Sequence, residues 1–127
     1  MNITEKETGK TIEAILEGIR RIKGQGITII DLNTIHHTEC GYFIICHGNS
    51  NTHVDAIAHS VEETTDEMTG EKIWHREGYR NAIWILLDYG NIMVHVFQKD
   101  ARDFYNLEDL WADAKITKIE EDNKEQI

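Results

Sequence analysis

The sequence predicts one α/β domain in which a mixed β-sheet is flanked by helices. Three patterns support this prediction: an amphipathic helix near the N-terminus, a strand–loop–helix unit in the middle of the chain, and a hairpin of two apolar strands after it. The chain has 127 residues, of which 40 % are hydrophobic, and this is enough to line a single core. It contains no proline and no internal repeat, so a single domain is expected.

The first helix is predicted by apolar residues that recur at helical spacing. These residues are Ile12, Ile15, Leu16, Ile19 and Ile22. Thr4 and Glu7 have the spacing of a capping box at the start of the helix, and Gly24 and Gly26 are expected to end it. Residues 27–32 follow as a strand rich in β-branched side chains.

A second strand and a second helix make up the middle of the chain. After an irregular polar stretch over residues 33–40, residues 41–46 are predicted as a central strand because they are apolar on both faces. Residues 47–52 form a loop rich in helix-capping side chains. The helix that follows ends at Gly70. Its apolar positions are Val54, Ile57, Ala58, Val61, Thr65 and Met68.

The hairpin is the strongest local pattern in the chain. A short strand over residues 72–76 precedes it, and its own strands over residues 82–89 and 92–98 are joined by Gly90 and Asn91. A two-residue turn predicts the pairs Tyr89–Ile92, Asp88–Met93, Leu86–His95 and Trp84–Phe97. Strand alternation gives a core face of Ile83, Ile85, Leu87, Ile92, Val94 and Val96. The opposite face, called the mixed face below, holds Trp84, Leu86, Asp88, Met93, His95 and Phe97.

The mixed face has two interpretations. It is either a second, smaller core under a helix or a recognition surface, because aromatic, Met and hydrogen-bonding side chains are typical of interface centres. Asp88 and His95 are diagonal neighbours on it, which predicts a hydrogen-bonded pair and a raised pKa for His95. Tyr89 is expected at the turn, with its side chain projecting past the edge of the sheet.

The C-terminal part of the chain is predicted to contain one further helix over residues 101–114. Its apolar side carries Phe104, Leu107, Leu110 and Trp111. Residues 115–127 alternate in charge and offer few apolar anchors, which predicts a flexible tail. The domain is therefore expected to span residues 1–114.

The charge of the chain limits its partners. It carries 23 acidic and 13 basic residues, for a net charge of −10, and residues 55–71 contain six acids without a Lys or Arg. Because nucleic-acid binding needs a basic stripe, direct sequence-specific recognition of nucleic acid is not expected. The sequence shows no apolar stretch of about 20 residues and no leader-like N-terminus. Two cysteines are too few for a disulfide framework, and a cytoplasmic protein without membrane contact is predicted.

A nucleotidyltransferase is the first enzyme class that the pattern suggests. Such enzymes often follow a strand with a Gly-Ser loop and a helix, which residues 48–50 resemble, and they hold Mg²⁺ with paired carboxylates. The hairpin offers Asp88 as its single carboxylate. This favours a simple helix cap at Ser50 over a metal enzyme.

Cysteine and histidine side chains suggest a second class of chemistry. Cys46, with His47 or His95 as base, has the residue types of a nucleophilic site, but Cys46 ends a buried strand, where a thiol serves as a small apolar filler. A zinc site would have to use His36, His37, Cys40, Cys46, His53 and His59. Their spacings match neither C-x-x-C nor H-x-x-x-H, so no metal and no other cofactor is predicted.

Long motifs of the chain resemble one known family. They are GYFIICHGNS from Gly41, EGYR from Glu77, WILLDYG from Trp84, VHVF from Val94 and YNLE from Tyr105, with Arg102, Leu110 and Trp111 between or after them. In this order they resemble the ribosomal silencing factor family, also called the Iojap-related family. The resemblance extends from Thr4 to Ala114.

This resemblance implies a function without catalysis. Family members bind the large ribosomal subunit through its protein numbered fourteen, on the face that meets the small subunit, and so prevent subunit joining and repress translation under nutrient limitation. The family fold is related to nucleotidyltransferases but lacks their metal carboxylates. The free protein is expected to be a homodimer. The acidic surface of the chain fits a basic ribosomal partner.

The hairpin carries the predicted contact residues. Trp84, Asp88 and Tyr89 are the first choices for contact with the ribosomal protein, and Gly90, Met93 and His95 complete the set. Two alternatives stay open from the sequence: a nucleotidyltransferase-like enzyme and a general assembly chaperone for the large subunit.

Overall fold

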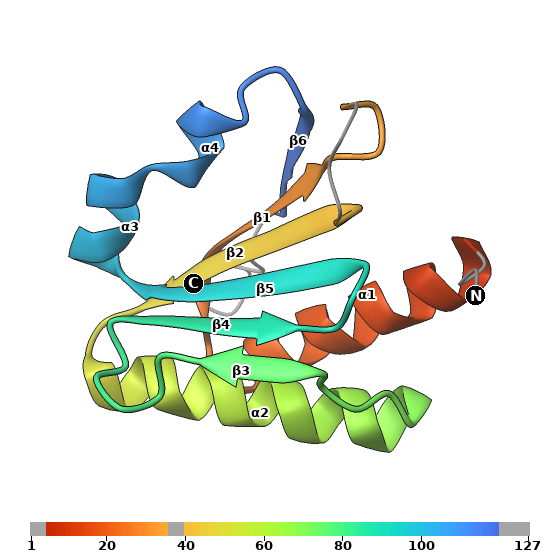
Figure 1. The fold of residues 1–127 in the computed structure, drawn as a ribbon. Coiled ribbons are helices and arrows are strands. Elements are labelled where there is room, and N and C mark those ends of the chain that lie inside the picture. The colour runs from red at the N-terminus through yellow and green to blue at the C-terminus, as the bar shows by residue number, and fades with distance from the viewer. Residues whose placement is uncertain (1–4, 36–39, 120–127) are drawn as a thin grey trace, which may run out of the picture.

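The computed structural model describes residues 5–35 and 40–119, which form one domain around a mixed six-stranded sheet (Figure 1). The strand order is β3-β4-β5-β2-β1-β6. β2 (Tyr42–Gly48) and β5 (Ile92–Gln98) run parallel at its centre, and the other neighbouring pairs are antiparallel. The remaining strands are β1 (Gln25–Asp31), β3 (His75–Glu77), β4 (Trp84–Asp88) and β6 (Lys115–Lys118). The predicted α/β class is confirmed.

Two long helices, α1 (Glu5–Arg21) and α2 (Asn51–Thr69), cover one face of the sheet (Figure 1). They approach closely at Gly18, where a Cβ would lie 2.7 Å from Cα of Val61. The hydroxyl of Ser60 donates a hydrogen bond of 2.7 Å to the carbonyl of Gly18 across this contact. Glycine usually weakens a helix, and its presence at position 18 is explained by the close packing of the two helices. Within the described ranges, neither of these helices nor any other is long and apolar enough to cross a membrane.

The ends of both helices follow capping rules. Ser50 is the N-cap of α2 and accepts from the amide of His53, and Gly70 ends the helix in the left-handed conformation, as predicted. α1 ends differently from the prediction, because the left-handed residue after it is Lys23 (φ +58°). Gly24 then donates its amide to the carbonyl of Ile19 at 2.9 Å. The expected cap residue Thr4 lies outside the described residues.

The hairpin has the predicted register. Trp84 lies opposite Phe97, Leu86 opposite His95 and Asp88 opposite Met93. Five of the six predicted core residues are buried. The prediction that Ile83 belongs to the core is wrong, since its side chain is 48 % exposed. The reason is that Ala82, in a left-handed conformation at φ +53°, turns the chain just before β4 begins.

The predicted helix over residues 101–114 is wrong in its extent. The structure has two short helices instead, α3 (Lys99–Tyr105) and α4 (Leu107–Leu110), because Asn106 between them is left-handed at φ +47°. This break leaves Phe104 and Leu110 exposed, at 81 % and 71 %, whereas Leu107 and Trp111 pack against the smaller core.

The predicted tail also contributes to the sheet. Residues Lys115–Lys118 form β6, which pairs with β1, so the domain does not end at residue 114. This edge strand has a single apolar side chain, Ile116, which packs on the smaller core, so its sequence gives little indication of a strand. Residues 120–127 of the predicted tail lie outside the described residues.

Candidate binding face

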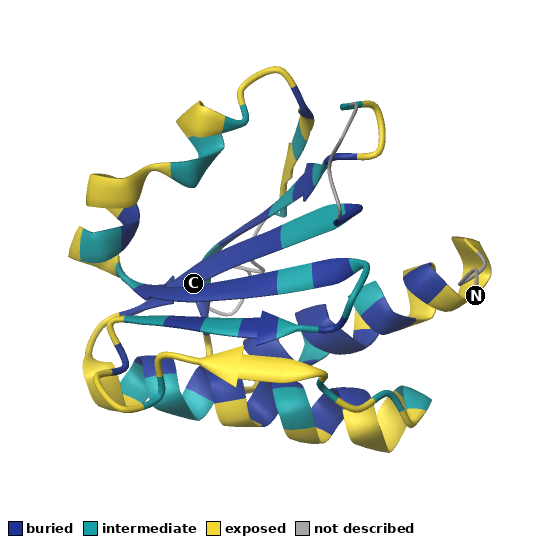
Figure 2. Ribbon diagram, in the orientation of Figure 1, coloured by how far each residue is buried: buried dark blue, intermediate teal, exposed yellow. Residues whose placement is uncertain are grey.

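The mixed face lies on the side of the sheet opposite α1 and α2. At one end it is covered by an aromatic cluster: the Trp84 ring stacks on Phe97 with centroids 4.8 Å apart and lies 4.7 Å from the ring of Tyr105. Toward the other end, Leu86, Asp88 and Met93 are half-buried. Figure 2 shows the corresponding teal stretches within the dark blue central strands. The face is thus a small core at one end, as the first interpretation predicts, and is open at the other end.

His95 lies buried at the centre of this face, with its ring 4.6 Å from that of Phe43 in an edge-on arrangement. The indole Nε1 of Trp84 donates to His95 Nδ1 at 3.1 Å. Since an indole can only donate, Nδ1 is the acceptor and Nε2 carries the proton. Nε2 is buried without a hydrogen-bond partner among the described residues.

The electrostatics of His95 contradict the sequence prediction. Burial lowers its pKa to about 4, whereas pairing with Asp88 would have raised it. Asp88 does not reach the imidazole: its Oδ1 accepts the amide of Gly90 at 2.7 Å and so closes the turn. A short aspartate side chain commonly bonds the backbone two residues ahead in this way. The predicted Asp88–His95 pair is therefore wrong.

Tyr89 does not project from the turn. Its side chain is 4 % exposed and packs in the main core, and its hydroxyl lies 2.8 Å from Oγ1 of Thr65 on α2. Burial raises the pKa of Tyr89 to about 12. The expectation that this side chain is displayed past the sheet edge is wrong, because α2 offers it both an apolar pocket and a hydrogen-bond partner.

Trp74 is an aromatic residue at this edge that the sequence reasoning missed. It is 72 % exposed, and its amide donates to the carbonyl of Asp88 at 2.9 Å. Its ring lies over Gly90, where a Cβ would be only 3.0 Å from it and where φ is +88°. The only sequence signal was a Trp in front of a short charged strand. An exposed indole thus lies over the turn of the hairpin.

The residues weighed for catalysis have structural roles. Ser50 caps α2, and Cys46 is fully buried with its pKa raised by burial to about 12, so its thiol is not a ready nucleophile. No group of three or more His, Cys, Asp or Glu residues that could hold a metal ion occurs within residues 5–35 and 40–119. The arrangement of the mixed face suits binding through apolar contact area with a few polar groups.

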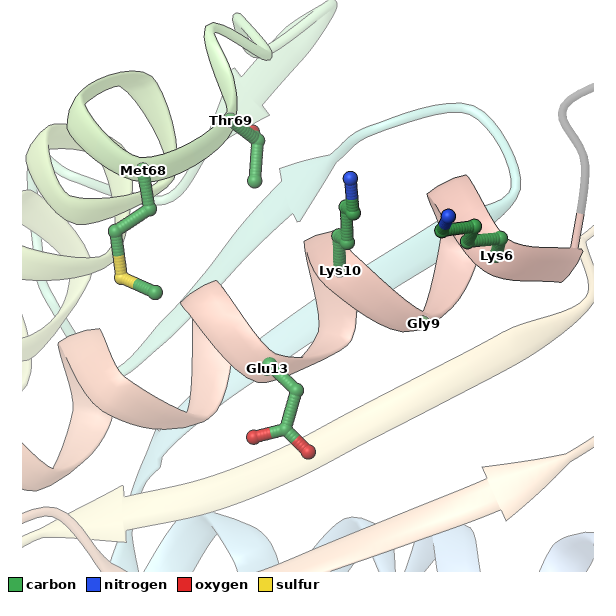
Figure 3. Close-up of a pocket in the computed structure, with 6 residues that line it drawn as sticks. All are labelled: Lys6, Gly9, Lys10, Glu13, Met68 and Thr69. Atoms are coloured by element: carbon green, nitrogen blue, oxygen red, sulfur yellow. The ribbon is translucent and has the colours of Figure 1, made fainter.

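Two hollows are lined by residues outside the mixed face. One, of about 530 Å³, lies between the start of α1 and the end of α2, and Figure 3 shows its lining, which includes Lys6, Lys10, Glu13 and Met68. The other, of about 410 Å³, lies beside Arg102 and His47.

Comparisons with known proteins agree on one family. The family model described as "Ribosomal silencing factor during starvation" matches residues 5–127. The protein named Ribosomal silencing factor RsfS of Halalkalibacterium halodurans is 49 % identical over 79 residues, 62 % of this chain and 67 % of that protein. The protein of the same name from Bacillus subtilis is 47 % identical over 79 residues, 62 % of this chain and 66 % of its own length. The matched segment thus spans about two thirds of the length of these relatives.

A solved structure supports the same assignment. A crystal structure of a protein from Chromobacterium violaceum superposes with a TM-score of 0.73 at 31 % identity and covers all of both chains. A fold this similar, together with the matching family model, extends the relationship from the sequence motifs to the architecture of the domain.

Proposed function

Because the chain belongs to the ribosomal silencing factor family, we propose that it represses translation by binding the large ribosomal subunit and keeping the small subunit from joining it. The proposed docking partner is the large-subunit protein numbered fourteen, which in this family lies on the face that meets the small subunit. Repression then requires only occupancy and steric exclusion, without catalysis. The place of action is the cytoplasm.

One observation carries the choice of contact surface. The open end of the mixed face offers half-buried Leu86, Asp88 and Met93, and the exposed ring of Trp74 lies over Gly90 at the adjoining turn. An apolar patch with an aromatic anchor and a carboxylate has the composition of an interface centre. Within the predicted contact set, we assign direct contact to Trp84, Asp88, Gly90 and Met93.

The remaining two predicted contact residues are assigned supporting roles. His95 holds the Trp84 ring through their hydrogen bond, and Tyr89 fixes the turn from below through α2. Their loss would act on binding through the shape of the face.

The net charge of −10 supports this choice of partner. Ribosomal proteins that sit on RNA carry positive surfaces, and complementary charge speeds encounter and rejects wrong partners. The same negative charge disfavours docking on ribosomal RNA itself. For the free protein we propose a homodimer, which sedimentation equilibrium would detect as twice the 14.7 kDa chain mass.

A pair of methionine variants tests the proposed surface. Met93→Ala removes a half-buried side chain from the mixed face, and Met68→Ala removes a 52 % exposed one from α2, on the opposite side of the sheet. Both should keep cooperative unfolding. We expect Met93→Ala to weaken binding of the purified ribosomal protein about tenfold and to restore subunit joining in sedimentation profiles, whereas Met68→Ala should do neither.

The two possible failures are distinguishable. Binding that is unchanged by Met93→Ala would reject the mixed face while leaving the partner in place. Absence of binding by the unmodified protein to the ribosomal protein, together with normal subunit joining in its presence, would reject the function itself.

A further inference from the structure

The cavity of about 410 Å³ lies at a distinctive point of the sheet. It is lined by His47 near the end of β2 and by Lys99 directly after β5, so it lies at the carboxyl ends of the parallel pair. From here the chain leaves β2 for α2 on one face of the sheet and leaves β5 for α3 at the other face (Figure 1). Crevices where successive connections diverge to opposite faces are the usual ligand sites of open α/β sheets.

The charge of the lining is opposite to that of the protein. Three cations, Lys99, Arg102 and Lys118, face one carboxylate, Glu108, in a chain whose net charge is −10. Lys118 is exposed, and Lys99 makes an exposed ion pair with Asp103 at 2.7 Å. Exposed pairs of this kind are weak, so Lys99 is free to exchange its partner for a ligand.

Arg102 is the buried cation of the group, at 8 % exposure. Its Nη1 donates to Nδ1 of His47 at 2.9 Å, and its Nη2 donates to Thr28 Oγ1 at 3.1 Å and to Glu108 at 2.6 Å. These bonds fix the plane of the guanidinium. They use both N–H groups of Nη2 and one N–H group of Nη1.

Gly26 keeps the cavity open beside this guanidinium. A Cβ at this position would lie 2.5 Å from Arg102 Nη1 and 2.8 Å from Cε1 of His47. Gly26 also has φ +62°, which other residues rarely adopt. The backbone therefore approaches the cation as closely as glycine allows, and a side chain at this position would fill the cavity next to Arg102.

We propose that this cavity binds a phosphate group of a small anionic ligand. Arg102 supplies fixed positive charge in the wall of the cavity, and Lys99 and Lys118 supply charged donors at the rim. A polynucleotide is the disfavoured ligand, because the acidic protein repels an extended phosphate chain, whereas a single phosphate group within the cavity is close to the local cations. The inference goes beyond the proposed function and does not depend on it.

The test uses pyrophosphate as the probe, with the isolated protein at low ionic strength. Titration followed by ¹H–¹⁵N NMR should give saturable shifts centred on the amides of Gly26, Thr28 and His47. Lys118→Gln should weaken binding about threefold to tenfold. Lys115→Gln is the matched control, because it removes the same charge from the same strand without touching the cavity, and it should leave the affinity unchanged.

Arg102→Lys adds a test of geometry, since it keeps the charge and removes the planar guanidinium that bonds to His47, Thr28 and Glu108. We expect a further loss of at least tenfold, with folding verified by its amide spectrum. The proposal is overturned if pyrophosphate causes no saturable shift, or if Lys115→Gln and Lys118→Gln lose affinity equally. It is also overturned if a short single-stranded RNA binds and pyrophosphate does not. Ribosomes take no part in these measurements, so their outcome is separate from that of the proposed function.

Discussion

Replacing Tyr89 with phenylalanine removes a single oxygen atom from the core beneath α2. The hydroxyl of Thr65 lies 2.9 Å from the carbonyl of Val61 and 3.1 Å from that of Glu62, so it donates its one proton to carbonyls of its own helix. The hydroxyl of Tyr89 must therefore be the donor in their 2.8 Å hydrogen bond. Tyr89→Phe keeps the ring packing and loses this one bond.

The expected cost of Tyr89→Phe is about 1 kcal/mol of unfolding free energy, the net value of a typical intramolecular hydrogen bond. For a domain of this size that is a fall in Tm of about 4 °C. Tyr89→Ala also removes a ring that is 4 % exposed, and large-to-small changes of this kind cost about 3–5 kcal/mol. The alanine variant is thus expected to be severely destabilised, in contrast to the tolerance expected of an exposed turn residue.

Urea unfolding of the three proteins measures these costs, and its pH dependence adds an independent check. The pKa of Tyr89 is raised by burial to about 12, above its ordinary value of 10. The unfolded chain therefore loses this proton first, and the stabilisation is complete below pH 10 and is lost as the pH rises through about 12. Tyr89→Phe lacks this titration, so the stability advantage of the unmodified protein over it should shrink across that range.

A Tyr89→Ala variant whose unfolding free energy stays within about 0.5 kcal/mol of the unmodified protein would refute the buried position of the ring. A stability difference between the unmodified protein and Tyr89→Phe that does not change from pH 9 to pH 12 would refute the burial of the hydroxyl.

Two further predictions concern His95 and the glycines. His95 should stay neutral down to about pH 4 in an NMR titration, because burial lowers its pKa. The stability that it contributes should therefore be complete above pH 6.5 and be lost as the pH falls through 4. A titration midpoint at or above pH 6.5 would contradict this prediction. Gly78→Ala should destabilise the domain by at least about 2 kcal/mol in chemical unfolding, because its Cβ would lie 2.1 Å from the carbonyl oxygen of Trp84 at φ +93°. Gly70→Ala, with φ +76° and no atom within 4 Å, is the control and should cost about 1 kcal/mol; equal losses would show that the clash is relieved cheaply.

The hairpin shows how far local rules reach. The two residues at its turn and the alternation of its strands predicted the pairing of Trp84 with Phe97 and of Asp88 with Met93, and the structure has both. The same alternation placed Trp84, Asp88, Met93 and His95 on one face. Register and face follow from the period of a strand and the length of a turn, which are properties of neighbouring residues.

The second helix was predictable for the same reason. Ser50 and Gly70 carry the start and stop signals of α2, and both act as predicted. At the C-terminal end, Asn106 divides the expected helix in two, and Lys115–Lys118 joins the sheet instead of forming a tail. The strand over Lys115–Lys118 depends on the free edge that β1 offers to a weakly apolar segment, and the segment alone does not reveal that partner.

By itself, then, the sequence determined the four inner strands, the long helices, the hairpin register and the family to which they belong. Tertiary structure decided which polar and aromatic groups meet: Tyr89 turned inward to Thr65, His95 bonded Trp84, and Trp74 stayed exposed above Gly90. It also assembled the Arg102 cavity from segments that are far apart in the chain. The reason is that periodicity fixes the direction of a side chain within its own element, whereas burial, pKa and hydrogen-bond partner depend on the element packed against it.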